Sequence, residues 1–156
     1  MRIDFRICSL LFLVAFTSCS SGKSGSQNNV SEPEEYEIVE RQSICLADFF
    51  EQEEEDYLVF CHADTCAQCQ EIIGDVARFA EDNLVKTYFL NVSESNNAIT
   101  KVSVDEVTVG VSSLADLVYA GTPTIFEVVN KTTIANVPGK DKCLTYLNEI
   151  RKNNEK

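Results

Sequence analysis

The sequence is poor in positive charge, and it contains no tryptophan and a single histidine, His62. Lysine and arginine total 13 against 25 aspartate and glutamate residues, which gives a formal charge of -12 at pH 7. No stretch gathers the few basic residues into a patch, so the composition argues against nucleic acid as a partner. The excess of acid instead favours solubility and keeps the chain away from anionic surfaces.

The length of 156 residues is enough for one domain with appendages. The hydrophobic fraction of 44% is ordinary for a globular core. Cysteine is the residue in unusual supply, with seven in the chain, so each cysteine needs its own interpretation.

The first 18 residues have the pattern of an export signal. Arg2 and Arg6 make a basic start, and the apolar run 7–16 is too short to span a membrane as a mature helix. The following Phe16-Thr17-Ser18-Cys19 resembles the bacterial lipobox, in which a cysteine is acylated and becomes the new N-terminus. The sequence therefore predicts a signal peptide over 1–18 and lipidation of Cys19; the alternative is an ordinary signal peptide cleaved nearby, with Cys19 incidental.

A polar segment follows the lipidation cysteine. Residues 20–35 are mostly Ser, Gly, Asn and Glu, which cannot bury enough apolar surface to offset the entropy of ordering them. We therefore expect a flexible linker over 19–35 and one domain over 36–156.

The central stretch of that domain is 57–80, YLVFCHADTCAQCQEIIGDVARFA. Its short apolar start predicts a buried strand, and the apolar spacing after Cys69 predicts an amphipathic helix. Cys66 and Cys69 thus lie where a strand gives way to a helix, whose first turn stabilises a thiolate through free N–H groups and the helix dipole. One exposed thiol and one recessed thiol are the minimum needed for thiol–disulfide exchange.

Periodicity and turn residues predict the remaining elements. Ser43 is a plausible N-cap for a helix that buries Phe49 and Phe50. Ser113 followed by Asp116 resembles a capping box and favours helix nearby. The predictions are strands over 36–41, 57–60, 84–92, 125–129 and 133–137, and helices over 43–50, 70–80, 98–119 and 141–152.

Together with the dithiol, Gly121-Thr122-Pro123-Thr124 before an apolar strand resembles the thioredoxin superfamily. The resemblance covers about 36–152 and implies an α/β thioredoxin fold: a mixed central sheet with helices on both faces. It also implies a cis-proline at Pro123 facing the dithiol. Small accessory thioredoxins of bacterial envelopes, including those associated with bacteriocin export, are similar in size and layout.

The resemblance assigns roles to these residues. Cys66 and Cys69 would be catalytic, as a redox-active disulfide with no other cofactor, and Thr122 and Pro123 would hold the client. The implied activity is that of an extracytoplasmic, membrane-tethered thiol–disulfide oxidoreductase. Its expected partners are client proteins with thiols or disulfides, a membrane redox partner, and the lipid membrane through Cys19.

Two residues near the dithiol differ from common thioredoxins. His62 stands at the position where thioredoxins usually carry tryptophan, and a nearby imidazolium would lower the pKa of Cys66, so His62 is a possible modulator. Phe60 stands where many thioredoxins have a buried aspartate that assists proton transfer. Several disulfide-handling relatives also lack that acid.

Three further cysteines are expected to be structural. By strand alternation Cys61 faces away from the dithiol helix, and the resemblance puts Cys45 on that same side, where a Cys45–Cys61 disulfide is one hypothesis. Cys143 should be buried on the dithiol side as a small hydrophobe.

Other functions remain open at this point. A thioredoxin fold can serve as a non-catalytic binding module or as a copper carrier that uses a cysteine pair and a histidine. The spacing of Cys61, Cys66 and Cys69 also matches plant-type [2Fe–2S] ferredoxins, which would require Cys143 as the fourth ligand. The prediction is no metal site, because the cysteines are expected in a strand and a helix rather than on one loop.

Overall fold

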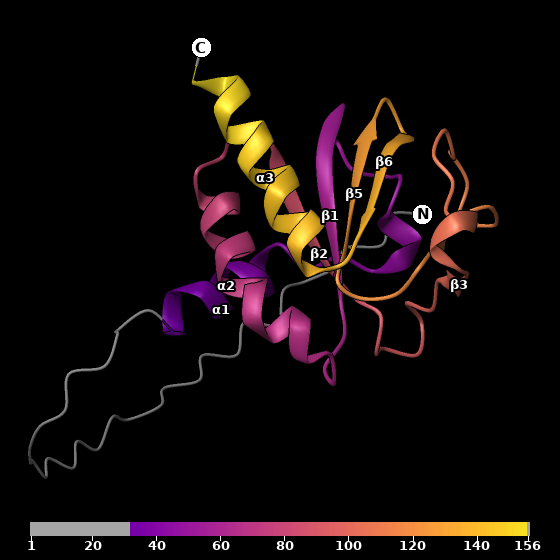
Figure 1. Cartoon of the computed structure of the whole chain (residues 1–156), viewed down its shortest axis with the longest axis horizontal. Helices are drawn as coiled ribbons and strands as arrows, with labels where there is room; N and C mark the ends of the chain where they lie inside the picture. Colours follow the sequence, from indigo (N-terminus) through magenta and orange to yellow (C-terminus); the bar gives the residue numbers. More distant parts are fainter. Residues whose placement is uncertain (1–31, 156) are drawn as a thin grey trace, which may run out of the picture.

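We analysed a computed structural model, which describes residues 32–155 (Figure 1). The signal segment, Cys19 and most of the linker lie outside the described residues, so the predictions made for them stay predictions. Within residues 32–155, no helix has the length and apolar character needed to cross a membrane. The elements are α1 (Glu32–Arg41), η1 (Leu46–Asp48), β1 (Asp56–His62), α2 (Ala67–Glu81), β2 (Lys86–Asn91), β3 (Thr100–Lys101), η2 (Val104–Glu106), β4 (Val118–Tyr119), β5 (Thr124–Val129), β6 (Thr132–Pro138) and α3 (Lys140–Asn154).

A mixed sheet with strand order β2-β1-β5-β6 forms the centre of the fold. Strand β1 runs parallel to β2 and antiparallel to β5, while β5 and β6 form an antiparallel hairpin. Strand β1 is near-continuously apolar because neighbouring strands and both faces cover it, and its residues from Tyr57 to Cys61 are buried. The strand predictions for 57–60, 84–92, 125–129 and 133–137 are confirmed, as are the helices following Cys69 and Gly139.

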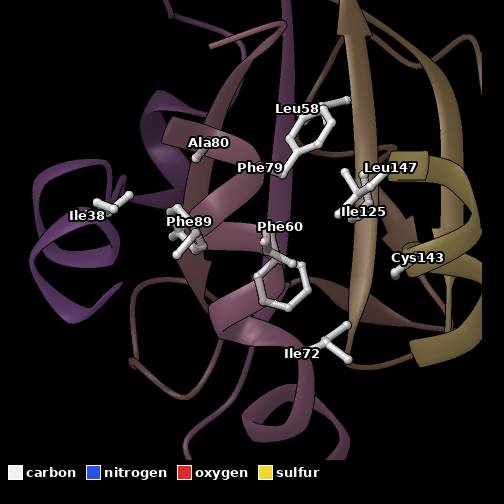
Figure 2. Packing of buried hydrophobic residues seen from close by; sticks show 12 residues of the cluster. Ile38, Leu58, Phe60, Ile72, Phe79, Ala80, Phe89, Ile125, Cys143 and Leu147 are labelled. Carbon is white, nitrogen blue, oxygen red and sulfur yellow. The ribbon is translucent and has the colours of Figure 1, made fainter. Parts of the chain in front are cut away.

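Alternation along β1 divides the core between the two faces of the sheet. Leu58 and Phe60 point to a cluster with α1, α2 and α3, where Ile72 and Leu147 also pack (Figure 2). The opposite cluster contains Tyr57, Val59 and Cys61 of β1, and Phe49, Phe50, Ile99 and Leu117 cover it. All three α-helices therefore lie on one face, and the other is covered by single 3-10 turns and irregular chain instead of the expected α-helices (Figure 1).

The strand predicted over 36–41 is wrong, because these residues belong to α1. Ile38 is 3% exposed in the helix-side core, and Glu35 forms an ion pair with Arg78 of α2. These contacts with α2 favour helix over the short alternating pattern. Helix α1 begins at Glu32, so the domain boundary predicted at residue 36 falls inside it.

The helix predicted over 43–50 is reduced to the 3-10 turn η1. Ser43 is not its N-cap: the Ser43 hydroxyl donates to the carbonyl oxygen of Val39 at 2.7 Å, and Ser43 forms an isolated bridge with Phe89 of β2. Phe49 and Phe50 are nevertheless buried, as the apolar spacing indicated.

The helix predicted over 98–119 is also wrong, because this segment holds only β3, η2 and β4. Its backbone pairs with β6: the N–H of Gly110 donates to the carbonyl of Thr133, and the N–H of Thr133 donates to the carbonyl of Val111. Just before this segment, the buried side chain of Asn97 accepts a hydrogen bond from the N–H of Leu46 at 2.8 Å. Hydrogen bonds to distant residues thus replace the helical ones that valine-rich sequence supports poorly.

Candidate active site

Cys66 is the N-cap of α2, and Cys69 lies in the first turn of that helix. The two are joined by a disulfide, with their Cα atoms 5.2 Å apart. The backbone N–H of Cys69 is shared between Sγ of Cys66 and the carbonyl of Cys66, each at 3.1 Å, so a donor of the first turn points at this sulfur. The prediction that the dithiol sits where a strand gives way to a helix is confirmed.

The two sulfurs differ in their access to solvent. Cys66 is half-buried, whereas Cys69, in the first turn of α2, is 2% exposed. An incoming sulfur therefore reaches Cys66, while Cys69 can react only with the atom bonded to Cys66. Thiol–disulfide exchange requires these two roles, one accessible cysteine that reacts with the client and one buried cysteine that resolves the mixed disulfide.

The Thr122–Pro123 peptide bond is cis, as the resemblance implied. Pro123 immediately precedes Thr124, which pairs with Cys61 at the end of β1. Strand β1 continues from there into the loop that ends at Cys66, so the proline and the dithiol lie at the same end of the sheet. The carbonyl of Pro123 accepts from the N–H of Gly139, the residue that opens α3.

Thr122 keeps its backbone polar groups free of protein partners. The neighbouring bonds run from the Thr124 hydroxyl to the Gly121 carbonyl at 2.6 Å and from Gly139 to Pro123. Among residues 32–155, no hydrogen bond uses the N–H or carbonyl of Thr122. Such groups are available to an extended chain lying alongside, as in strand addition.

A cavity of about 300 Å³ lies directly beside this proline loop. Its walls come from the proline loop, from the turn into α3 and from the segment 98–119. The lining residues are Lys101, Val104, Ala120, Gly121, Thr122, Pro123, Pro138 and Gly139. Sequence reasoning missed Lys101 and Val104, because nothing in the local pattern shows which loop they approach.

His62 lies at the end of β1, and its ring stacks on Phe60 with the ring centroids 6.0 Å apart. Burial lowers the pKa of the imidazole below its ordinary value, and the charges of Asp64 and Glu94 oppose that shift. The Nε2 atom is buried without a partner among the described residues. A hollow of about 330 Å³ beside the ring is lined by residues of α1 and of the end of β2, and neither dithiol cysteine lines it. The modulation of Cys66 by His62 stays a prediction.

Phe60 fills the space beneath the first turns of α2. Its side chain is fully buried against Ile72 and Phe89, as Figure 2 shows from close by. The side chain offers no proton acceptor to Cys69, so this chain lacks the buried acid at the Phe60 position.

The three remaining described cysteines are free thiols, so the hypothesis of a Cys45–Cys61 disulfide is wrong. Cys45 is exposed, whereas Cys61 is fully buried on the face away from α2. Cys143 is buried on the α2 side, as expected, and its Sγ donates to the carbonyl of Val137 at 3.2 Å. Desolvation raises the pKa of Cys61 far above its ordinary value and that of Cys143 to about 12.

This placement also bears on the metal alternatives. Cys61 and Cys69 face opposite sides of the sheet, so they cannot ligate one iron–sulfur cluster. Within residues 32–155, no group of three or more His, Cys, Asp or Glu side chains is arranged to hold a metal ion.

Comparison with known proteins bears on the fold alone. A scan of protein-family models found no match, and neither did a search of curated proteins. Among solved structures, a chain from a study of thiol resolution in yeast mitochondrial 1-Cys peroxiredoxin matches with a TM-score of 0.50 at 12% identity, covering 71% of this chain and 93% of that one. Spinach chloroplast thioredoxin f, long form, matches with a TM-score of 0.49 at 15% identity, covering 81% and 99%.

The match with a TM-score of 0.50 shows a likeness of fold. The strand order, the dithiol at the start of α2 and the cis-proline before β5 are features of the same fold. The chain is therefore an α/β protein of the thioredoxin fold with a Cys-x-x-Cys pair.

Proposed function

We propose that this protein is an extracytoplasmic, membrane-tethered thiol–disulfide oxidoreductase that acts on protein disulfides through Cys66 and Cys69. The observation that carries the activity is the asymmetry of the pair: a partly accessible N-cap cysteine is bonded to a cysteine that is 2% exposed. A disulfide that closes so short a loop adds little stability through chain entropy, so a structural purpose explains it poorly.

The exchange proceeds in two steps that can run in either direction. In reduction, the Cys66 thiolate attacks a client disulfide, forms a Cys66–client mixed disulfide and releases one client thiolate. The Cys69 thiolate then attacks Cys66 Sγ, releases the second client thiolate and closes the Cys66–Cys69 disulfide. Two electrons pass from the dithiol to the client, and a membrane redox partner would restore the dithiol.

The proline loop provides the client site in this proposal. The free N–H and carbonyl of Thr122 can pair with an extended client segment, while Pro123 shapes the adjacent wall of the cavity. Thr122 and Pro123 lie at the same end of the sheet as Cys66, so a client segment held by them presents its own sulfur to the dithiol.

A redox titration tests the activity. The full chain is equilibrated in graded glutathione buffers, and Cys66 and Cys69 are followed by differential alkylation and mass spectrometry. We expect a reversible two-electron transition confined to this pair, between about -120 and -270 mV. A pair that never reduces in that range, or that stays reduced while retaining copper, would instead support a binding module or copper carrier.

Attachment to the extracytoplasmic face of a bacterial membrane is a separate part of the proposal. It rests on the basic start, the short apolar run and Cys19 in the sequence. Growth of a bacterial host that produces the full chain with an alkyne-labelled palmitate should label it, and Cys19→Ala should abolish the label. Equal labelling of both forms would exclude Cys19 as the anchor.

A further inference from the structure

Lys101 lies against the backbone that leads into the cis peptide bond. A Cβ atom added to Gly121 would sit 3.3 Å from Cε and 3.5 Å from Nζ of Lys101. The ammonium group is therefore beside the residue that precedes Thr122, and Lys101 lines the same cavity as Thr122 and Pro123.

The β3–β4 ladder fixes this position. Lys101 pairs with Tyr119 across the two strands, and Val102 donates to the carbonyl of Tyr119 at 2.9 Å. Only Ala120 separates Tyr119 from Gly121 in the chain. Backbone pairing therefore holds the Cα of Lys101 beside the cavity.

Lys101 is also unpaired in a strongly acidic protein. The ion pairs found within residues 32–155 engage Arg78, Lys131, Lys140 and Arg151. Lys101 takes part in none of them and is exposed. Near Val104, the carboxylate of Glu106 already accepts from the N–H and hydroxyl of Ser103.

The rest of the cavity is largely apolar or backbone. Val104 is 54% exposed although it is hydrophobic, and Pro123 and Pro138 form further walls. The cavity thus offers one unpaired cation, apolar contact surface and the free backbone groups of Thr122. An extended peptide segment with a carboxylate side chain matches all three features.

We propose that Lys101 selects clients whose reacting cysteine is flanked by aspartate or glutamate. This inference rests on the proposed function and names the substrate class of the same site. Lys101 acts on binding and orientation of the client segment, and it takes no part in the transfer of electrons or protons. The carboxylate pairs with the ammonium group while the client backbone lies along Thr122.

A set of peptide disulfides tests this selection. Each peptide is acetylated and amidated and carries one cysteine as a mixed disulfide with neutral 2-thiopyridine; its two flanking residues are Glu, Gln or Lys. Attack by Cys66 on the peptide sulfur releases thiopyridone, which is followed by absorbance, and Cys69 then releases the peptide thiol. The full chain is reduced and freed of reductant beforehand, and the rate of Cys66→Ser is subtracted to remove the contribution of other thiols.

At physiological salt, we expect the wild-type protein to react with the Glu peptide about two- to fivefold faster than with the Gln peptide, the range of one exposed ion pair. Lys101→Met should bring this ratio to about one, and Lys101→Glu should make the Lys peptide the fastest. Lys152→Glu, the same charge change at the far end of α3, should keep the wild-type ratio.

The Gln peptide is the reference within each variant, and Lys152→Glu should leave its rate unchanged. A wild-type ratio near one, or a ratio that survives Lys101→Glu, would overturn the selection by Lys101 while the Cys66-dependent reaction stands. Absence of any Cys66-dependent rate with all three peptides would overturn the proposed function itself.

Discussion

The backbone N–H of Cys69 lies 3.1 Å from Sγ of Cys66 and donates to it, although Cys69 itself is the buried member of the pair. One residue therefore supplies both a hydrogen-bond donor and the second sulfur. When the disulfide is reduced, the same N–H is placed to stabilise a thiolate at Cys66, with the N-terminus of α2 adding to the effect.

The reduced pair should react unequally with an alkylating agent. We expect iodoacetamide at pH 7 to modify Cys66 at least about tenfold faster than Cys69, because only Cys66 is both accessible and stabilised as a thiolate. Peptide mapping after timed quenching measures both rates. In urea the two rates should converge; equal rates in the folded protein would contradict the asymmetry.

The three free thiols should differ in their rate of alkylation according to their burial. Without denaturant, N-ethylmaleimide at pH 7 should label Cys45 within minutes and leave Cys61 and Cys143 unlabelled, because burial raises the pKa of both buried thiols and blocks access. Mass spectrometry after digestion gives the occupancy at each site. All three should label in urea without reductant, and protection of Cys45 there would restore the disulfide hypothesis.

His62 should make the stability of the protein fall in mild acid. Burial lowers the pKa of His62 in the folded state, so below the unfolded value of about 6.5 the unfolded chain binds the extra proton more readily. The free energy of unfolding therefore decreases as the pH falls through 6.5 and stops changing below the folded pKa. Urea unfolding of the oxidised protein between pH 5 and 7.5 measures the slope.

His62→Gln is the control for this titration, because it keeps a polar side chain that does not ionise. Its free energy of unfolding should depend less on pH than that of the wild type over the same interval. Identical slopes in the two proteins would assign the dependence to other groups.

Phe60 should be among the costliest core positions. Phe60→Ala leaves a cavity beneath α2 and is expected to destabilise the oxidised protein by about 3–5 kcal/mol, a large share of a typical total of about 5–15 kcal/mol. Urea unfolding followed by circular dichroism measures the loss. Ile134→Ala, at a side chain 53% exposed on β6, should cost less than about 1 kcal/mol. Similar losses at both sites would contradict the described packing.

The sequence identified the dithiol because the signal there is local. The apolar run at 57–60, the two cysteines and the helical spacing after Cys69 lie within one stretch, and each element forms as its own residues dictate. The same holds for the β5–β6 hairpin, whose turn residues Asn130 and Lys131 adopt the positive φ angles of a tight turn. Gly-Thr-Pro-Thr was recognisable because this order of residues before a strand occurs in few folds.

Local pattern was not enough where distant residues decide the conformation. Residues 36–41 alternate like a strand, yet Ile38 packs against the α2 side of the sheet and draws them into helix. Residues 98–119 carry a helical stripe, yet backbone hydrogen bonds of Gly110 and Val111 with Thr133 of β6 hold them in an irregular path. Intrinsic propensities differ by less than about 1 kcal/mol per residue, which a few such contacts exceed.

The sequence by itself determined the chemistry available to this protein: two sulfurs at the start of a helix, and a proline loop to meet them. Only the tertiary structure decided which cysteines stay apart, and that Lys101 stands beside Gly121. The physical reason is the range of the interactions. Capping and helical periodicity act within a few residues, so the sequence shows them directly. Burial and the β3–β4 ladder join segments that are far apart in the chain, and no local pattern predicts that these segments will meet.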